Sequence, residues 1–181
     1  MALTIETIRE ARWREGKRFI YLDNIVGLAA AATEDVLVCV EDKNIVIEGI
    51  SVEANVESLT WEPFIGTQFT EGTGTELSAI PRNSAADSRP GAKITKSATI
   101  TNDGQSLSGV PLNIVAQIFR NNNYYLNEEL ISSDFVYMAN TCYLIRLTNN
   151  SADATDVQLV IDILMIMPTS TAPTGINSAP P

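Results

Sequence analysis

The sequence predicts a mainly β protein, an antiparallel jelly-roll-like β-sandwich with a short N-terminal helix or arm. Three observations lead to this prediction. From Phe19 onward, apolar and polar residues alternate with a period of two in about nine or ten short segments. Turn-forming residues separate these segments at intervals of roughly 8–15 residues, and no helix-length pattern lies between them. With 181 residues, the chain is long enough to bury one core without a metal or a disulfide.

The first 18 residues are expected to form a basic helix or arm. Thr4 suits the N-cap position, and Gly16 suits the end of the helix. Five cationic side chains stand against three glutamates, which gives residues 1–18 a net charge of +2 in a chain of net charge −10. This basic leader favours contact with an acidic protein surface, and a solvated helix face laced with Glu–Arg pairs explains it equally well. The helix needs a surface to dock on because its apolar side chains are few, namely Ile5, Ile8 and Trp13.

Residues 19–167 are expected to form the sandwich, and residues 168–181 a Pro-rich extended tail. The LAAAAT after the first expected strand is compatible with one helical turn. The Gly- and Ser-rich passage from Gly66 predicts two loops around a short strand at Glu76 to Ile80. Asn102-Asp103-Gly104 signals a tight turn. The main expected strands lie in RFIYLD, DVLVCVE, NIVIEGISVEANVESLTWEPF, KITKSATITNDG, LNIVAQIFRNNN, DFVYMAN and YLIRLTNNSADATDVQLVIDI.

Residues 143–163 form the most regular hairpin pattern of the chain, with a turn at Asn149 to Asp153. Period-two alternation puts one set of apolar side chains on a common face. This set is Tyr143, Ile145 and Leu147 on the first strand, and Val157, Leu159, Ile161 and Ile163 on the second. Leu144 and Val160 lie on the opposite faces among polar and charged residues. We therefore expect the N-terminal arm or a neighbouring copy to cover those faces.

Charge and hydropathy argue against two classes of partner. The net charge of −10 argues against nucleic acid, because phosphate binding needs a basic face. No apolar run reaches the ~18 residues of a membrane span, and the N-terminus holds no apolar signal-peptide core. Cys39 and Cys142 each lie in an apolar run and are too few for a disulfide scaffold or a zinc cage. We expect them to be two buried thiols.

The sequence offers little for catalysis, so we expect no enzyme activity, no catalytic residue, no cofactor and no metal. The chain has no histidine, the commonest general base and a frequent metal ligand. A glycosidase needs only two carboxylates, but the glutamates beside Trp61 lie on an ordinary alternating strand. Trp61, Tyr124 and Tyr125 are a candidate sugar-binding face. The two tyrosines are also candidate anchors in a protein interface, because tyrosine buries area at low entropic cost.

Two stretches of the chain resemble a group of small virion proteins of tailed bacteriophages. They are AIPRNSAADSRPGAKITKSATITNDGQSL and NTCYLIRLTNNSADATDVQLVIDI. In that group a strand ends in a Pro- and Asn-rich loop, here Ile80 to Asn83, and a Thr-rich strand and an Asn-Asp-Gly-type turn follow. Near the C-terminus comes a Tyr-Leu-Ile-x-Leu-Thr-Asn-x-Ser-x-x-Ala hairpin, here residues 143–154. The resemblance covers roughly residues 45–163, and its motifs are short turn and strand patterns.

The resemblance implies a head decoration or cement protein with a jelly-roll-like sandwich, related in shape to carbohydrate-binding modules. Such a protein is made in the bacterial cytoplasm and binds the outer head surface of the virion. Its expected partners are the major capsid protein and further copies of itself, as a dimer or trimer. The alternative is a phage tail, baseplate or receptor-binding module that holds a glycan. The LMIMP ending and the basic leader depart from the group's pattern, which bears on the position in the virion. The residues expected at the contact are Arg9, Arg12, Trp13, Arg14, Lys17, Arg18, Tyr124 and Tyr125.

Overall fold

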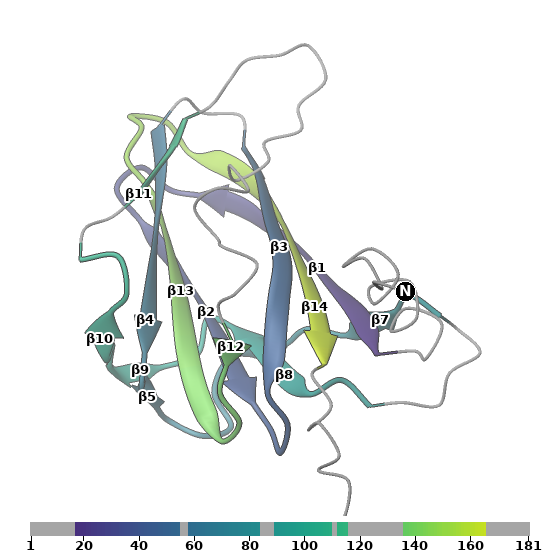
Figure 1. The fold of residues 1–181 in the computed structure, drawn as a ribbon. Coiled ribbons are helices and arrows are strands. Elements are labelled where there is room, and N and C mark those ends of the chain that lie inside the picture. Colours follow the sequence, from purple (N-terminus) through teal and green to yellow (C-terminus); the bar gives the residue numbers. More distant parts are fainter. Residues whose placement is uncertain (1–16, 55–57, 84–88, 110–111, 116–135, 166–181) are drawn as a thin grey trace, which may run out of the picture.

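The structure is a computed structural model that describes residues 17–54, 58–83, 89–109, 112–115 and 136–165. Within these ranges the chain is mainly β, its strands pair antiparallel, and no helix is present (Figure 1). Among the described residues there is accordingly no helix of the length and apolar character that a membrane crossing requires. The expected N-terminal helix and the expected Pro-rich tail lie outside the described residues.

The first sheet contains five strands in the order β12-β3-β14-β1-β7. Two long pairings form its centre, β1 with β14 and β14 with β3. Its strands are β1 (Arg18–Leu28), β3 (Ile45–Ala54), β7 (Ala79–Pro81), β12 (Val136–Tyr137) and β14 (Thr155–Met165).

The second sheet contains seven strands, six of them in the order β10-β4-β13-β2-β8-β6, and β11 pairs with another part of β4. Its strands are β2 (Thr33–Val40), β4 (Ser58–Ile65), β6 (Thr75–Glu76), β8 (Ala92–Lys96), β10 (Gln105–Ser106), β11 (Leu112–Val115) and β13 (Thr141–Asn149). A two-stranded ribbon joins β5 (Gln68–Phe69) and β9 (Ile100–Asn102). The short strand expected at Glu76 to Ile80 is divided, because β6 pairs in the second sheet and β7 in the first.

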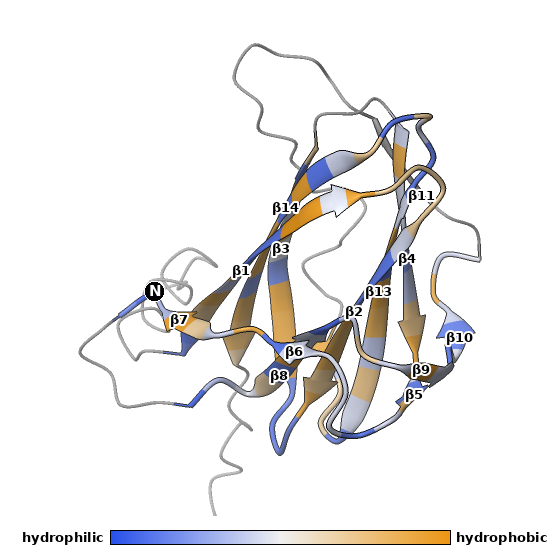
Figure 2. Ribbon diagram, turned by 180° about the vertical axis from the view of Figure 1, so that it is seen from behind, coloured by the Kyte–Doolittle hydropathy of each residue, from blue (hydrophilic) through white to orange (hydrophobic). Residues whose placement is uncertain are grey.

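One apolar core lies between the two large sheets. Alternate residues of each long strand point into it, so each sheet contributes one face, as period-two alternation predicts. Figure 2 shows apolar residues along the strands of both sheets and polar residues in several of the connecting turns. Each fully buried large side chain contributes on the order of 1.5–3 kcal/mol. The inward faces predicted for the last hairpin are confirmed, since Tyr143, Ile145, Leu147, Val157, Leu159, Ile161 and Ile163 are all buried.

A bulge in β3 lets the buried residues on both sides of it face the core together with those of β14. Asp162 is opposite Gly49 and Ile163 is opposite Ile47, so Glu48 is an additional residue in the pairing. Ile47 and Ile50 are both buried in the core even though three positions separate them. Because of the bulge, the side chain of Glu48 points away from the core and toward Arg18 of β1.

The outer face of the second sheet is covered by the chain itself. Leu144 is 0% exposed. The backbone N–H of Thr67 donates to the carbonyl of Cys142 at 3.2 Å, and Phe69 of β5 lines a small cavity together with Leu37. The segment that carries β5 therefore lies over this face. Leu144 is buried within the single chain, so the expectation that a neighbouring copy covers it is wrong.

Cys39 and Cys142 form a disulfide, so the prediction of two buried thiols is wrong. The pairing of β2 with β13 puts them directly opposite each other, with Cα atoms 4.1 Å apart. The two cysteines are 103 positions apart in the sequence, so composition and local pattern do not reveal that they face each other. The disulfide covalently joins the two central strands of the second sheet.

Asn149 joins two turns of the fold. Its side-chain amide donates to the carbonyl oxygens of Leu28 at 3.0 Å, Ala29 at 3.2 Å and Asp153 at 2.8 Å, and Asn149 is 0% exposed. Its backbone also exchanges hydrogen bonds with the LAAAAT segment, accepting from Ala31 N–H and donating to the Ala32 carbonyl. That segment is a tight turn between β1 and β2, with Ala31 at a φ of 57°, and not the helical turn considered for it.

We expect Asn149→Asp to lower the free energy of unfolding by about 2–4 kcal/mol, because buried carbonyl groups lose their donor and a carboxylate is buried beside them. Urea unfolding followed by circular dichroism measures this loss. Asn150→Asp is the matched control, because Asn150 is exposed and its side-chain amide donates to the Thr60 hydroxyl. Equal effects of the two substitutions would contradict the role given to Asn149.

We expect the double substitution Cys39→Ser and Cys142→Ser to lower the free energy of unfolding by about 2–5 kcal/mol, because the disulfide closes a long loop in the unfolded chain. Dithiothreitol should destabilise the natural protein by a similar amount and leave the double variant unchanged. Two free thiols in the unfolded, unreduced protein, measured by thiol titration, would show that the bond is absent.

Candidate functional site

The outward side of β1, β14 and β7 carries a partly exposed apolar row. We call the outer face the surface formed by Ile20, Leu22, Ile80 and Val160 with the neighbouring charged residues of β1, β3 and β14. Strand pairing makes the row continuous, since Leu22 is opposite Val160 and Ile20 is opposite Ile80. Leu22 is 49% and Ile80 46% exposed. Adjacent exposed apolar side chains on one sheet face are typical of an interaction surface.

A cluster of charges borders the apolar row at the start of β1. The Arg18 guanidinium lies 2.6 Å from one oxygen of Asp162, 3.0 Å from the other, and 3.1 Å from Glu48. Arg82 lies 3.5 Å from Asp162. The hydrogen bond to Asp162 raises the pKa of Arg18 despite partial burial. The side chains of Glu48 and Asp162 are only 8% and 13% exposed, so these carboxylates depend on their partners.

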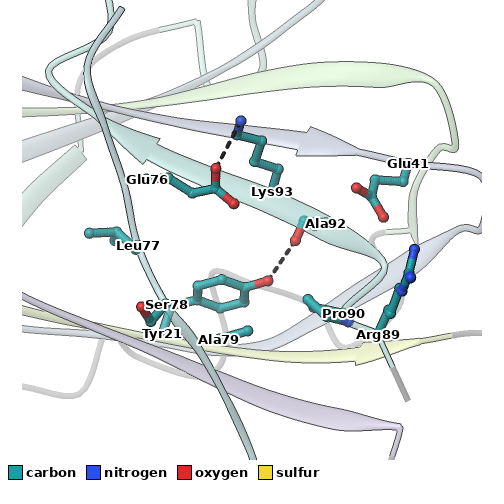
Figure 3. A pocket seen from close by; sticks show the side chains of 10 residues that line it. All are labelled: Tyr21, Glu41, Glu76, Leu77, Ser78, Ala79, Arg89, Pro90, Ala92 and Lys93. Carbon is teal, nitrogen blue, oxygen red and sulfur yellow. Dashed lines mark hydrogen bonds and ion pairs between the residues drawn. The ribbon is translucent and has the colours of Figure 1, made fainter. Parts of the chain in front are cut away.

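A cavity of about 510 Å³ opens between β1, β8 and the crossover from β6 to β7 (Figure 3). Its walls combine apolar and charged residues, and Lys93 Nζ lies 2.9 Å from a Glu76 oxygen. Figure 3 places Arg89 and Glu41 near one end of the cavity. The cavity is lined by Tyr21, Glu41, Glu76, Leu77, Ser78, Ala79, Arg89, Pro90, Ala92 and Lys93.

Tyr21 at the base of this cavity has a structural role. Its hydroxyl donates to the carbonyl of Ala92, which joins β1 of the first sheet to β8 of the second. Burial raises the pKa of the Tyr21 phenol, and the charges of Glu41 and Glu76 raise it further. A phenol in this state keeps its proton and its hydrogen bond. Lys96 and Asp23 form a second link between the same strands through an ion pair.

A second charge cluster lies on the outer side of the second sheet. Arg146 donates to both oxygens of Asp35 at 2.8 and 2.9 Å and to both oxygens of Asp103 at 2.7 and 2.8 Å. Its guanidinium also lies over the Phe64 ring, 5.5 Å from the centroid. The hydrogen bonds raise the pKa of Arg146, chiefly through Asp35, and lower the pKa of Asp103. The cluster fixes the loop after β9 onto β13 and β2.

Two of the predicted contact residues lie at the start of β1, which pairs with β14 and β7. The Lys17 carbonyl accepts a hydrogen bond from Met165 N–H at 3.0 Å, and Arg18 opens β1 and pairs with Asp162 of its own chain. The other six lie outside the described residues: Arg9, Arg12, Trp13, Arg14, Tyr124 and Tyr125. The sequence reasoning missed Leu22 and Ile80. A signal existed in RFIYLD, where Phe19 and Tyr21 take the inward phase and the outward phase is also apolar.

Trp61 is a core residue, so its predicted place in a sugar-binding face is wrong. It is 4% exposed and packs in the cluster between the sheets, where a sugar cannot stack on its ring. The carboxylate of Glu62 accepts a hydrogen bond from the Ser106 hydroxyl at 2.7 Å and so helps to hold β10 beside β4. Among the described residues, no group of three or more His, Cys, Asp or Glu side chains is arranged to hold a metal ion.

Comparison of the chain with protein-family models, curated proteins and solved structures gave no match.

We expect acid to weaken the attachment of the loop after β9 to β13. Because Arg146 lowers the pKa of Asp103, the folded state binds this proton more weakly than the unfolded state. The stabilisation is fully present above the ordinary carboxyl pKa, near 4, and is lost as the pH falls through the lowered value. Asp103→Asn should lower the urea midpoint at pH 7 and reduce its dependence on pH below about 4.

Asp42→Asn is the control for this measurement, because Asp42 lies at an exposed bend between β2 and β3. We expect it to change the free energy of unfolding by less than about 0.5 kcal/mol. Identical acid profiles for Asp103→Asn and the natural protein would contradict the predicted role of the Arg146–Asp103 pair.

Proposed function

We propose that this chain is a structural protein of a tailed bacteriophage, a decoration or cement protein that binds the outer surface of the head and stabilises the capsid lattice. The observation that carries the proposal is the strand order. Eight strands taken in chain order as β1, β2, β3, β4, β11, β12, β13 and β14 pair as β12-β3-β14-β1 in one sheet and β11-β4-β13-β2 in the other. This is the strand order of a jelly roll.

Jelly rolls recur in viral capsid proteins and in lectins. A fold alone does not determine a function, so the proposed class needs further support. Two features provide it. The outer face presents Leu22 and Ile80 about half exposed beside partly buried carboxylates, which suits packing against another protein segment better than solvation. The resemblance of residues 45–163 to small phage virion proteins points to the same class.

The proposed mechanism is mechanical and involves no turnover. A repeating capsid lattice offers many equivalent sites, so modest contacts per copy combine to give strong attachment. The sandwich supplies a rigid body, because the disulfide and the Arg146 cluster hold the second sheet and the β1–β8 links join it to the first. Each copy spans neighbouring subunits of the major capsid protein, and copies associate symmetrically as a dimer or trimer.

Copy number per virion tests the proposal. Quantitative mass spectrometry of purified particles, calibrated on the major capsid protein, should find on the order of hundreds of copies, as lattice decoration requires. A handful of copies per particle would favour a tail, baseplate or receptor-binding position. Absence from purified virions would overturn the proposal.

We expect removal of residues 1–16 to leave the sandwich folded and to lower capsid occupancy at least about tenfold, because one of the attachment elements is lost. The deletion stops before Lys17, because Lys17 and Arg18 bond to β14. Rebinding to heads stripped of the protein, with circular dichroism to check the fold, measures the effect. Removal of residues 168–181 is the control and should leave occupancy unchanged. Unchanged occupancy without residues 1–16 would exclude the arm as an attachment element.

A further inference from the structure

We infer that the outer face is the docking site of residues 1–16 of the same chain, which lie back across β1 and β14. This inference does not depend on a position in a virion. It rests on the partly exposed apolar row, on the length and starting point of the segment, and on the match between the residue types of the two surfaces.

The apolar row departs from what a solvent-facing sheet requires. In a sheet with one wet face, the outward residues of each strand are polar. On β1 the outward positions Ile20 and Leu22 are apolar, and Val160 and Ile80 flank them. On the second sheet, by contrast, the outer residues Leu37 and Leu144 are buried within the chain, and Leu37 lines a cavity together with Phe69 of β5. The apolar row of the first sheet lacks a full cover among the described residues.

Residues 1–16 have the length and the starting point to supply that cover. The hydrogen bond from Met165 N–H to the Lys17 carbonyl fixes the start of β1 at the end of β14. Gly16, directly before it, permits the chain to reverse. A helix over residues 4–15 is about 18 Å long at 1.5 Å per residue. That length matches between five and six strand residues at about 3.3 Å each, which reaches from Arg18 to Leu22.

The two surfaces also match in chemistry. At 100° per residue, one side of the expected helix carries Ile5, Ile8, Arg9, Arg12 and Trp13. This side is part apolar and part cationic. The outer face is part apolar and part anionic, with the carboxylates of Glu48, Glu53 and Asp162 against the guanidinium groups of Arg18 and Arg82. Apolar side chains meet the apolar row, and Arg9 and Arg12 meet the carboxylates that border it.

This arrangement separates the predicted contact residues into two groups. Arg9, Arg12 and Trp13 point toward the sandwich, whereas Arg14 is on the opposite side of the helix and points outward. If the arm attaches the protein to a capsid, Arg14 then belongs to the exposed surface that makes this contact. The remaining arm residues position the helix.

Limited proteolysis of the full chain tests the docking. Trypsin cleaves after Arg9, Arg12 and Arg14, and a synthetic peptide of residues 1–18 provides the unprotected reference rate. In the natural protein, cleavage after Arg12 should be at least about tenfold slower than in the peptide, because docking hides the site. The double variant Leu22→Asp and Ile80→Asp should restore the peptide rate.

The matched control is Met138→Asp with Leu107→Asp, two exposed apolar residues outside the apolar row, 52% and 38% exposed. It should keep the slow rate. Equal unfolding midpoints of the two double variants separate loss of docking from loss of fold. A second reporter is Trp13→Ala, which should free the arm while the outer face is unchanged.

Cleavage of the natural protein at the peptide rate would overturn the inference. Protection that increases with protein concentration would also overturn it, because the occupant of the outer face would then be the arm of a second copy. The measurement uses the isolated protein without capsids. Failure of the docking inference is therefore distinguishable from failure of the proposed decoration function, which is tested by copy number.

Discussion

The buried side-chain amide of Asn149 is the interaction on which the rest of the sandwich depends. It joins the turn between β1 and β2 to the turn between β13 and β14 through three backbone carbonyls. From these turns β1 pairs with β14 in one sheet, and β2 pairs with β13 in the other. One side chain thereby sets where both central pairings begin. A single neutral amide suits this place, because it offers donors to the carbonyls and an acceptor to the Ser151 N–H without burying a charge.

Once these two pairings are set, the position of each functional feature follows from the register. On the outer side of the second sheet, Cys39 meets Cys142 and Arg146 meets Asp35. On the outer side of the first sheet, Leu22 meets Val160, and Arg18 comes within reach of Asp162. The outer sides of the two sheets differ in how far their apolar residues are buried. On the second, Leu37 and Leu144 are buried within the chain, whereas the first carries the exposed Leu22 and Ile80 and is the surface on which residues 1–16 are inferred to dock.

The sequence predicted the strands well and the contacts between distant strands poorly, for a physical reason. Alternation is local, so the inward face of Tyr143, Ile145 and Leu147 could be predicted from a few neighbouring residues. Pairing is not local, and neither the disulfide nor the cover over Leu144 follows from local pattern. Trp61 illustrates the same limit, because an aromatic residue near carboxylates resembles a sugar site until the core around it is known. Of the predicted contact residues, only Lys17 and Arg18 lie within the described residues.

The hydrogen bond between Met165 and Lys17 places the start of β1 and the end of β14 side by side. The paired strands β1 and β14 are antiparallel neighbours, so tension applied through both positions would load their ladder from one end. Hydrogen bonds loaded in this way break one after another, as in a zipper, and resist far less force than bonds loaded together in shear. A protein with this geometry bears load best across its folded body. The connections at Lys17 and Met165 are suited to tethering and not to bearing tension.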